Sequence, residues 1–204
     1  AVRMLSHLEQ IECFRKILRR SELPLNYSKG FNPKPLISFG PAISVGYESE
    51  AEYIDAELSS RVGAEELRRN IERQLPAGFG LISVKTVPIF FPSIESSVNA
   101  VRYQIAGDFP GNIQDIIDEF RLKKDKLLKQ NKDGSVSEIE TKLIIKDIAL
   151  MPDGLNILMN IAPGKNIKPE RVVEELLPGA KQEDFKICRK NLYLAKKTGE
   201  LADI

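Results

Sequence analysis

The stretch that organises the chain covers residues 26–46 and reads NYSKGFNPKPLISFGPAISVG. Its three glycines and three prolines permit or fix backbone angles that a plain connector does not need, so the stretch predicts a shaped loop. The other side chains are of kinds that bind ligands, with rings, polar groups and cations. We expect this loop to form much of a ligand surface, with a polyanion as its ligand. The residues concerned are Asn26, Tyr27, Ser28, Lys29, Gly30, Phe31, Asn32 and Lys34.

Length and composition indicate a globular protein. The chain has 204 residues, of which 42% are apolar and 29% charged, and this length allows one large domain or two small ones. No apolar run approaches the roughly 20 residues that span a bilayer. The first residues do not have the pattern of a secretory signal. We therefore expect a cytoplasmic protein without a membrane partner.

Charge is distributed unevenly although the net charge is only +1. Residues 1–40 contain seven Lys or Arg against three Glu, whereas residues 48–57 contain five acids and no base. Two interpretations of the acidic run stay open: a solvated face, or ion pairs with Arg15 and Arg19. A second basic patch comprises Lys123, Lys124, Lys126 and Lys129, which we expect to face solvent.

Cysteine and histidine usage argues against a metal site in this chain. Cys13 and Cys188 are far apart in sequence and have no His or Cys partner at metal-ligand spacing, so we expect both to fill apolar space as thiols. His7 is the only histidine. We expect no cofactor and no metal in this chain.

The first half of the chain predicts a helix, the loop with a strand, a second strand, a second helix and a further strand. Ser6 and Glu9 have capping-box spacing, and an apolar stripe follows them at helical steps. Residues 52–58 alternate as a half-buried strand does, which places Asp55 on the solvent-facing side. A helix is expected through residues 67–75 and a strand over 81–87.

The second half predicts the order β-α-β-β-α-β. Strands are expected over residues 101–105, 136–143, 155–161 and 185–195, the second continuing toward 148. Helices are expected over 112–128 and 169–177, and residues 131–134 read as a turn. The fold class is therefore α+β, with two tandem ferredoxin-like units and antiparallel sheets. The units are residues 1–88 and 99–198, joined by a linker over 89–98, and the first unit lacks its opening strand.

Several motifs resemble one protein family. They are SHLE at residues 6–9, YSKGFNPKP at 27–35, ISFGP at 37–41 and ESEAEY at 48–53. In order and spacing they closely resemble the uncharacterised bacterial family of radical SAM-linked proteins, which occur fused to or encoded beside radical S-adenosylmethionine proteins. Members of the family usually have a short strand before the position of Ala1, and this sequence lacks it. Two interpretations stay open: a trimmed chain, or a domain cut from a longer protein. The resemblance also implies a radical SAM protein as partner, fused or separate. S-adenosylmethionine and an iron-sulfur cluster would then belong to that partner, since two separated cysteines cannot supply a cluster motif.

His7 has two interpretations. As the residue after the helix cap it is expected at the positive end of a helix dipole, and it could act as a base on an RNA 2′-hydroxyl. Some tandem ferredoxin-like proteins that process CRISPR RNA use a histidine and a glycine-rich loop, which is an analogy of fold alone. The other interpretation is a hydrogen-bonded structural histidine.

The leading functional hypothesis is a non-catalytic, RNA-binding or substrate-presenting domain that works with a radical SAM enzyme in tRNA or rRNA modification. Arg15, Arg19, Lys29 and Lys34 would contact phosphates, and Tyr27 and Phe31 would stack on bases. Asn26, Ser28 and Asn32 would act as polar readers. The alternatives are a metal-independent endoribonuclease that uses His7, and a protein-binding adaptor for the radical SAM partner.

Overall fold

The structure is a computed structural model that describes residues 2–123, 125–130, 133–161, 167–196 and 200–203. Lys124, Asn131 and Lys132, which belong to the expected basic patch and turn, lie outside these residues. The described chain has the α+β class, with six α-helices and several antiparallel sheets. It divides into two compact units: unit 1 is Ala1–Tyr47 with Glu52–Ser97, and unit 2 is Glu48–Ala51 with Val98–Ile204.

Unit 1 is built from short elements around a two-stranded sheet. Their bounds are η1 Val2–Met4, α1 His7–Arg20, β1 Ile37–Phe39, β3 Ile54–Ala56, α2 Ala64–Glu72 and α3 Ile94–Ser97. Strand β1 pairs with β3 antiparallel, with Ser38 opposite Asp55. The buried apolar side chains of α1 are Ile17 and Leu18. The helix begins as expected, because Ser6 and Glu9 form the reciprocal bonds of a capping box.

The expected strand over residues 81–87 is wrong. These residues form no strand, and two of their apolar side chains, Ile82 and Val87, are 68% and 55% exposed. Alternating apolar residues form a strand only where a neighbouring strand accepts their hydrogen bonds and a core covers one face. Part of the expected linker is also ordered, since its last residues form α3.

Asp55 is not the solvent-facing strand residue that the alternation predicted. It is half-buried, and its Oδ2 accepts a hydrogen bond from the backbone N–H of Ile94 at 3.1 Å. Ile94 is the first residue of α3, whose amides have no partner within the helix. Asp55 therefore ties β3 to α3, which is a structural role.

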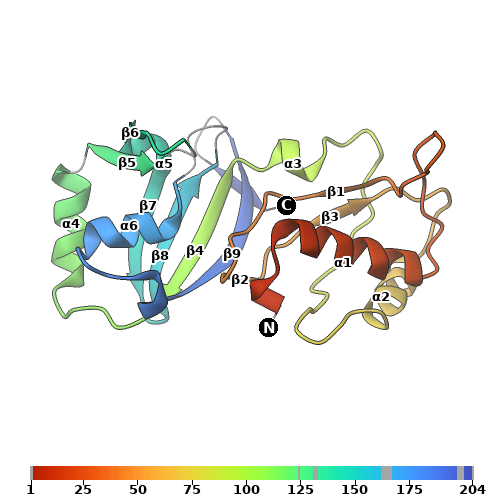
Figure 1. Ribbon diagram of the computed structural model, residues 1–204, viewed down its shortest axis with the longest axis horizontal. Helices are drawn as coiled ribbons and strands as arrows, with labels where there is room; N and C mark the ends of the chain where they lie inside the picture. Colours follow the sequence, from red (N-terminus) through yellow and green to blue (C-terminus); the bar gives the residue numbers. More distant parts are fainter. Residues whose placement is uncertain (1, 124, 131–132, 162–166, 197–199, 204) are drawn as a thin grey trace. The chain divides into compact units, whose positions relative to one another are not determined.

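Unit 2 contains a six-stranded sheet, a separate two-stranded sheet and three α-helices in its described residues. Its elements are β2 Glu48–Ser49, β4 Ala100–Ala106, α4 Ile113–Lys123, β5 Lys126–Gln130, β6 Val136–Glu140, α5 Thr141–Ile144, β7 Ile145–Met151, β8 Gly154–Asn160, α6 Pro169–Leu176, η2 Gln182–Asp184, β9 Lys186–Ala195 and β10 Leu201–Asp203. The strand order is β10-β9-β4-β8-β7, antiparallel throughout, and β2 pairs with β9 in parallel. Figure 1 shows α4 and α6 beside the same face of this sheet.

The core of unit 2 lies between that sheet face and the two helices. Ile105, Leu155 and Ile157 are fully buried on β4 and β8, and the helices contribute Ile117 and Val172. Burial of these apolar side chains stabilises unit 2.

Two expected elements of unit 2 differ from the structure. The first helix of unit 2, α4, ends at Lys123 and does not reach residue 128. Residues 126–130 instead form β5, which pairs with β6 as a hairpin in which Leu127 is fully buried. The strand expected over 136–143 stops at Glu140, and the short helix α5 separates it from β7. Periodicity alone does not distinguish a short apolar strand from the end of a helix.

None of the helices in the described residues is both long enough and apolar enough to cross a lipid bilayer.

Candidate functional site

The loop predicted to bind a ligand contains a narrow hairpin over residues 26–36, here called the hairpin loop. Its two limbs are joined by backbone hydrogen bonds from Leu36 N to Asn26 O and from Ser28 N to Lys34 O, both 2.8 Å long. Asn26 N also donates to Glu57 O at 2.8 Å, next to β3. Figure 1 shows this loop extending beyond α1 before the chain enters β1. The limbs are therefore held, and residues 29–33 form the tip.

The tip takes its shape from residues with special backbone properties. Gly30 has φ +139°, a conformation that side chains rarely allow. Lys34 N donates to the Ser28 hydroxyl oxygen at 3.0 Å, which closes the base of the tip. Pro35 is buried behind it. The glycine and proline spacing of the sequence thus produces a closed hairpin with an exposed end.

The side chains at the tip are open to solvent. Phe31 is fully exposed at 110% of the reference area, and Tyr27 is 48% exposed. Lys29, Asn32 and Lys34 are also exposed. Single exposed apolar side chains are common on protein surfaces, so the exposure of Phe31 alone does not indicate a binding site. Together with the exposed cations of Lys29 and Lys34, its ring can contact a flat, negatively charged ligand.

Two of the expected polar readers have roles in holding the loop. The Ser28 hydroxyl is engaged with Lys34, and half-buried Asn26 pairs through its backbone with Glu57 and Leu36. The Asn26 amide group lies 3.5 Å from Leu58 O, a long hydrogen bond. Of the three residues, Asn32 is the one whose side chain is exposed at the tip.

The two arginines predicted to contact phosphate differ in their surroundings. Arg15 Nη1 lies 2.6 Å from Glu12 Oε1 on the same helix, so its charge is already balanced. Arg19 is exposed in the last turn of α1. The ion pair recorded for Arg15 is thus with α1 itself and not with the acidic run.

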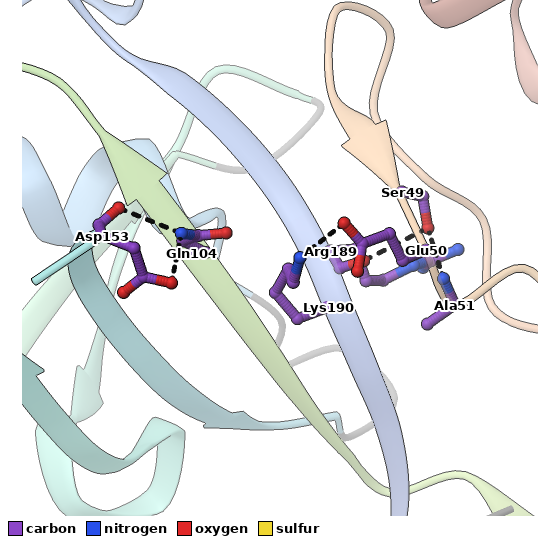
Figure 2. Close-up of polar contacts among 7 residues, drawn as sticks. All are labelled: Ser49, Glu50, Ala51, Gln104, Asp153, Arg189 and Lys190. Carbon is purple, nitrogen blue, oxygen red and sulfur yellow. Dashed lines mark hydrogen bonds and ion pairs between the residues drawn. The ribbon is translucent and has the colours of Figure 1, made fainter. Parts of the chain in front are cut away.

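The first part of the acidic run, residues 48–51, belongs to unit 2, whereas the rest of the run belongs to unit 1. Residues 48–49 form β2 on the edge of β9, and Glu50 N donates to Arg189 O at 2.9 Å. Figure 2 shows Lys190 of β9 reaching Glu50, with Nζ and Oε1 2.5 Å apart. This hydrogen bond raises the pKa of Lys190. The run is therefore partly a strand of the sheet and not simply a solvated face.

Cys188 lies beside β2, where Glu48 is its partner in register. Burial raises the pKa of its thiol, and the carboxylates of Glu50 and Glu48 add to that effect. Both Cys13 and Cys188 are free thiols. A raised thiol pKa disfavours the reactive thiolate, in agreement with a packing role.

His7 is the first residue of α1 and is half-buried. It lines a hollow of about 10 Å³ together with Gln10, Phe39 and Tyr53. That volume holds about one water molecule and is too small for a nucleotide. The small size of the hollow therefore favours the interpretation of His7 as a structural histidine.

The capping box at the start of α1 should be detectable in the titration of the Glu9 carboxyl group. Ser6 N donates to Glu9 Oε2 at 2.7 Å, and the Ser6 hydroxyl donates to the same oxygen. These bonds stabilise the carboxylate and lower the pKa of Glu9. We expect the NMR titration of Glu9 to have its midpoint below that of an unperturbed glutamate.

Because the folded-state pKa is the lower one, the stabilisation is present above the pKa of unfolded Glu9 and is lost as the pH falls through the folded value. Replacing Ser6 by alanine removes the hydroxyl bond but keeps the backbone N–H bond, so it should raise the midpoint toward the ordinary range. Gln10 lies outside the box, so Gln10→Ala is the control. A midpoint that Ser6→Ala leaves unmoved would show that the bonds do not persist in solution.

The described residues contain no group of three or more His, Cys, Asp or Glu that could hold a metal ion.

A protein-family comparison identifies the chain. Residues 1–169 match the model of DUF2344, described as an uncharacterized protein conserved in bacteria. The chain belongs to this family. The DUF2344 match includes the whole hairpin loop, β2 and most of unit 2, so the expectation of an uncharacterised bacterial family is confirmed, and the link to radical SAM proteins stays a prediction. A search of the curated proteins finds no significant match.

Proposed function

We propose that this protein binds RNA through the hairpin loop and presents it to a radical SAM enzyme that modifies tRNA or rRNA. The observation that carries the proposal is the exposed end of the hairpin loop, where the fully exposed Phe31 is flanked in the chain by the exposed Lys29 and Lys34. The resemblance of the motifs to radical SAM-linked proteins supplies the expected partner.

The chemistry of the tip suits a nucleic acid. Lysines neutralise backbone phosphates and release counterions, and an exposed ring stacks on the face of a base. Arg19 adds a further exposed cation at the end of α1. Arg15 contributes less, since Glu12 balances its charge.

We also propose that unit 2 is a ferredoxin-like unit. Its strands β9-β4-β8-β7 are antiparallel, and α4 and α6 follow β4 and β8 in the chain, as the βαββαβ plan requires. The β5–β6 hairpin would then be an insertion after α4. The order α1, β1, β3, α2 of unit 1 supports an incomplete version of the same plan. Ferredoxin-like units commonly bind RNA. This agrees with the proposed function, but a shared fold is not by itself evidence for a function.

RNA binding is tested by removing the two lysines of the tip. We expect Lys29→Ala/Lys34→Ala to weaken the binding of a structured RNA at least tenfold, since two phosphate contacts are lost. The matched control is Lys146→Ala/Lys186→Ala, which removes the same charge from exposed positions on unit 2 and should bind nearly as well as wild type. Fluorescence anisotropy with a labelled tRNA transcript measures all three.

Equal affinities for the tip variant and the control would remove the hairpin loop from RNA binding. In that case the exposed Phe31 would point to the protein-adaptor alternative. Co-purification of the radical SAM partner without RNA, lost in Phe31→Ala, would then be the expected result.

A further inference from the structure

The tip of the hairpin loop presents a single ring with both faces accessible. Phe31 is fully exposed, and within the described part of the chain its ring stacks on no other ring. By contrast, Phe14 packs edge-on against Phe79 with ring centroids 5.0 Å apart, and Phe90 lies 5.9 Å from Phe91. Phe31 is therefore available to be covered on either face by a flat partner.

The ring is carried on a loop that is already ordered. The limb bonds from Leu36 to Asn26 and from Ser28 to Lys34, with the Ser28 hydroxyl bond, leave only the five residues 29–33 unpaired. A ligand that stacks on Phe31 need not order the loop first, so less conformational entropy is lost on binding.

The cations lie on both sides of the ring in the chain. Lys29 precedes Phe31 by two residues and Lys34 follows it by three, and both are exposed. Lysine is a flexible point charge that suits backbone phosphates. A base on Phe31 and its flanking phosphates on Lys29 and Lys34 would use all three side chains.

We infer that the hairpin loop takes one unpaired nucleotide of an RNA bulge or terminal loop, with its base stacked on Phe31. This inference rests on the proposed function and narrows its substrate. In a paired helix the faces of the bases are covered by their neighbours, and the deep, narrow major groove of A-form RNA excludes side chains. One ring on a narrow tip is also a single stacking platform, whereas a strip of nucleotides needs several.

The experiment compares two hairpin RNAs that differ by one bulged adenosine in an otherwise fully paired stem, closed by the same compact tetraloop. We expect wild type to bind the bulged RNA roughly 10- to 100-fold more tightly than the paired one, in line with the strength of base–aromatic stacking. Phe31→Leu should abolish this preference and keep the weak, salt-dependent binding of both RNAs. Phe31→Tyr should retain the preference, because it keeps the ring.

Phe90→Leu is the matched control, since Phe90 is 82% exposed in the same unit but lies outside the hairpin loop. It should preserve the preference for the bulge. Equal wild-type affinity for the two RNAs, with binding still present, would overturn this inference and leave the proposed function standing. Binding of neither RNA at low salt would overturn both.

Discussion

Replacing Gly154 by alanine should destabilise unit 2 by about 4 kcal/mol or more, an exceptionally large loss for one substitution that combines overpacking with backbone strain. Gly154 has φ +123° and begins β8, opposite Met151 on β7. A Cβ there would collide with the carbonyl oxygen of Ile105 on β4 and lie 3.1 Å from its carbonyl carbon. These are backbone atoms of a central strand, so the collision is relieved only if β4 and β8 move apart.

Gly134 provides the matched control for this effect. It also has a positive φ, +84°, but its Cβ would meet nothing within 4 Å. Gly134→Ala should therefore cost only the backbone strain, about 1–2 kcal/mol. Urea unfolding followed by far-UV circular dichroism measures both variants. Equal losses would contradict the close approach of β8 to β4.

The second large effect is expected at Glu50, where β2 joins the sheet of unit 2. Glu50 N donates to the carbonyl oxygen of Arg189, a residue that is 1% exposed. Proline at position 50 has no N–H, so it would remove this backbone hydrogen bond between the end of β2 and β9. We expect Glu50→Pro to cost about 1–3 kcal/mol through the loss of this bond at a buried residue.

Glu50→Gln separates the backbone bond from the ion pair. It keeps the N–H but removes the charge that contacts Lys190, a contact between side chains 56% and 29% exposed. Ion pairs this accessible contribute about 0–1 kcal/mol. The glutamine variant should therefore be nearly as stable as wild type in the same urea titration. If proline and glutamine have the same small effect, β2 is not held to β9 in solution.

The parts of the fold that the sequence predicted are those controlled by neighbouring residues. The capping box at Ser6 and Glu9, the first helix and the main strands of unit 2 each depend on residues a few positions apart. The same is true of the hairpin loop, where Gly30 and the surrounding prolines indicate a shaped turn. Such signals are visible without knowledge of the rest of the chain.

The elements that were missed depend on distant partners. β2 pairs with β9, and Glu50 reaches Lys190 across 140 positions. Leu127 belongs to a strand because β6 pairs beside it, although its spacing also continues a helix. Asp55 alternates as an exposed strand residue does, yet it caps α3. In each case the tertiary neighbour decided the local structure.

The candidate site was predictable in composition but not in geometry. The sequence indicated which residues carry rings and charges, and the structure adds that Phe31 and Lys29 are exposed while the Ser28 hydroxyl is used within the loop. Arg15 illustrates the limit, since Glu12 one turn earlier balances its charge. The spacing of Glu and Arg three residues apart on a helix is a sequence signal that could have predicted this ion pair.

The most direct test of the account is the salt dependence of RNA binding by wild type and by Lys29→Ala/Lys34→Ala. For single-stranded contacts each phosphate contributes about 0.7 to the slope of log K against log salt, so removal of two lysines should lower the magnitude of the slope by about 1.4. The account predicts that decrease for the tip variant and no comparable decrease for Lys146→Ala/Lys186→Ala. Identical slopes for wild type and the tip variant would contradict it.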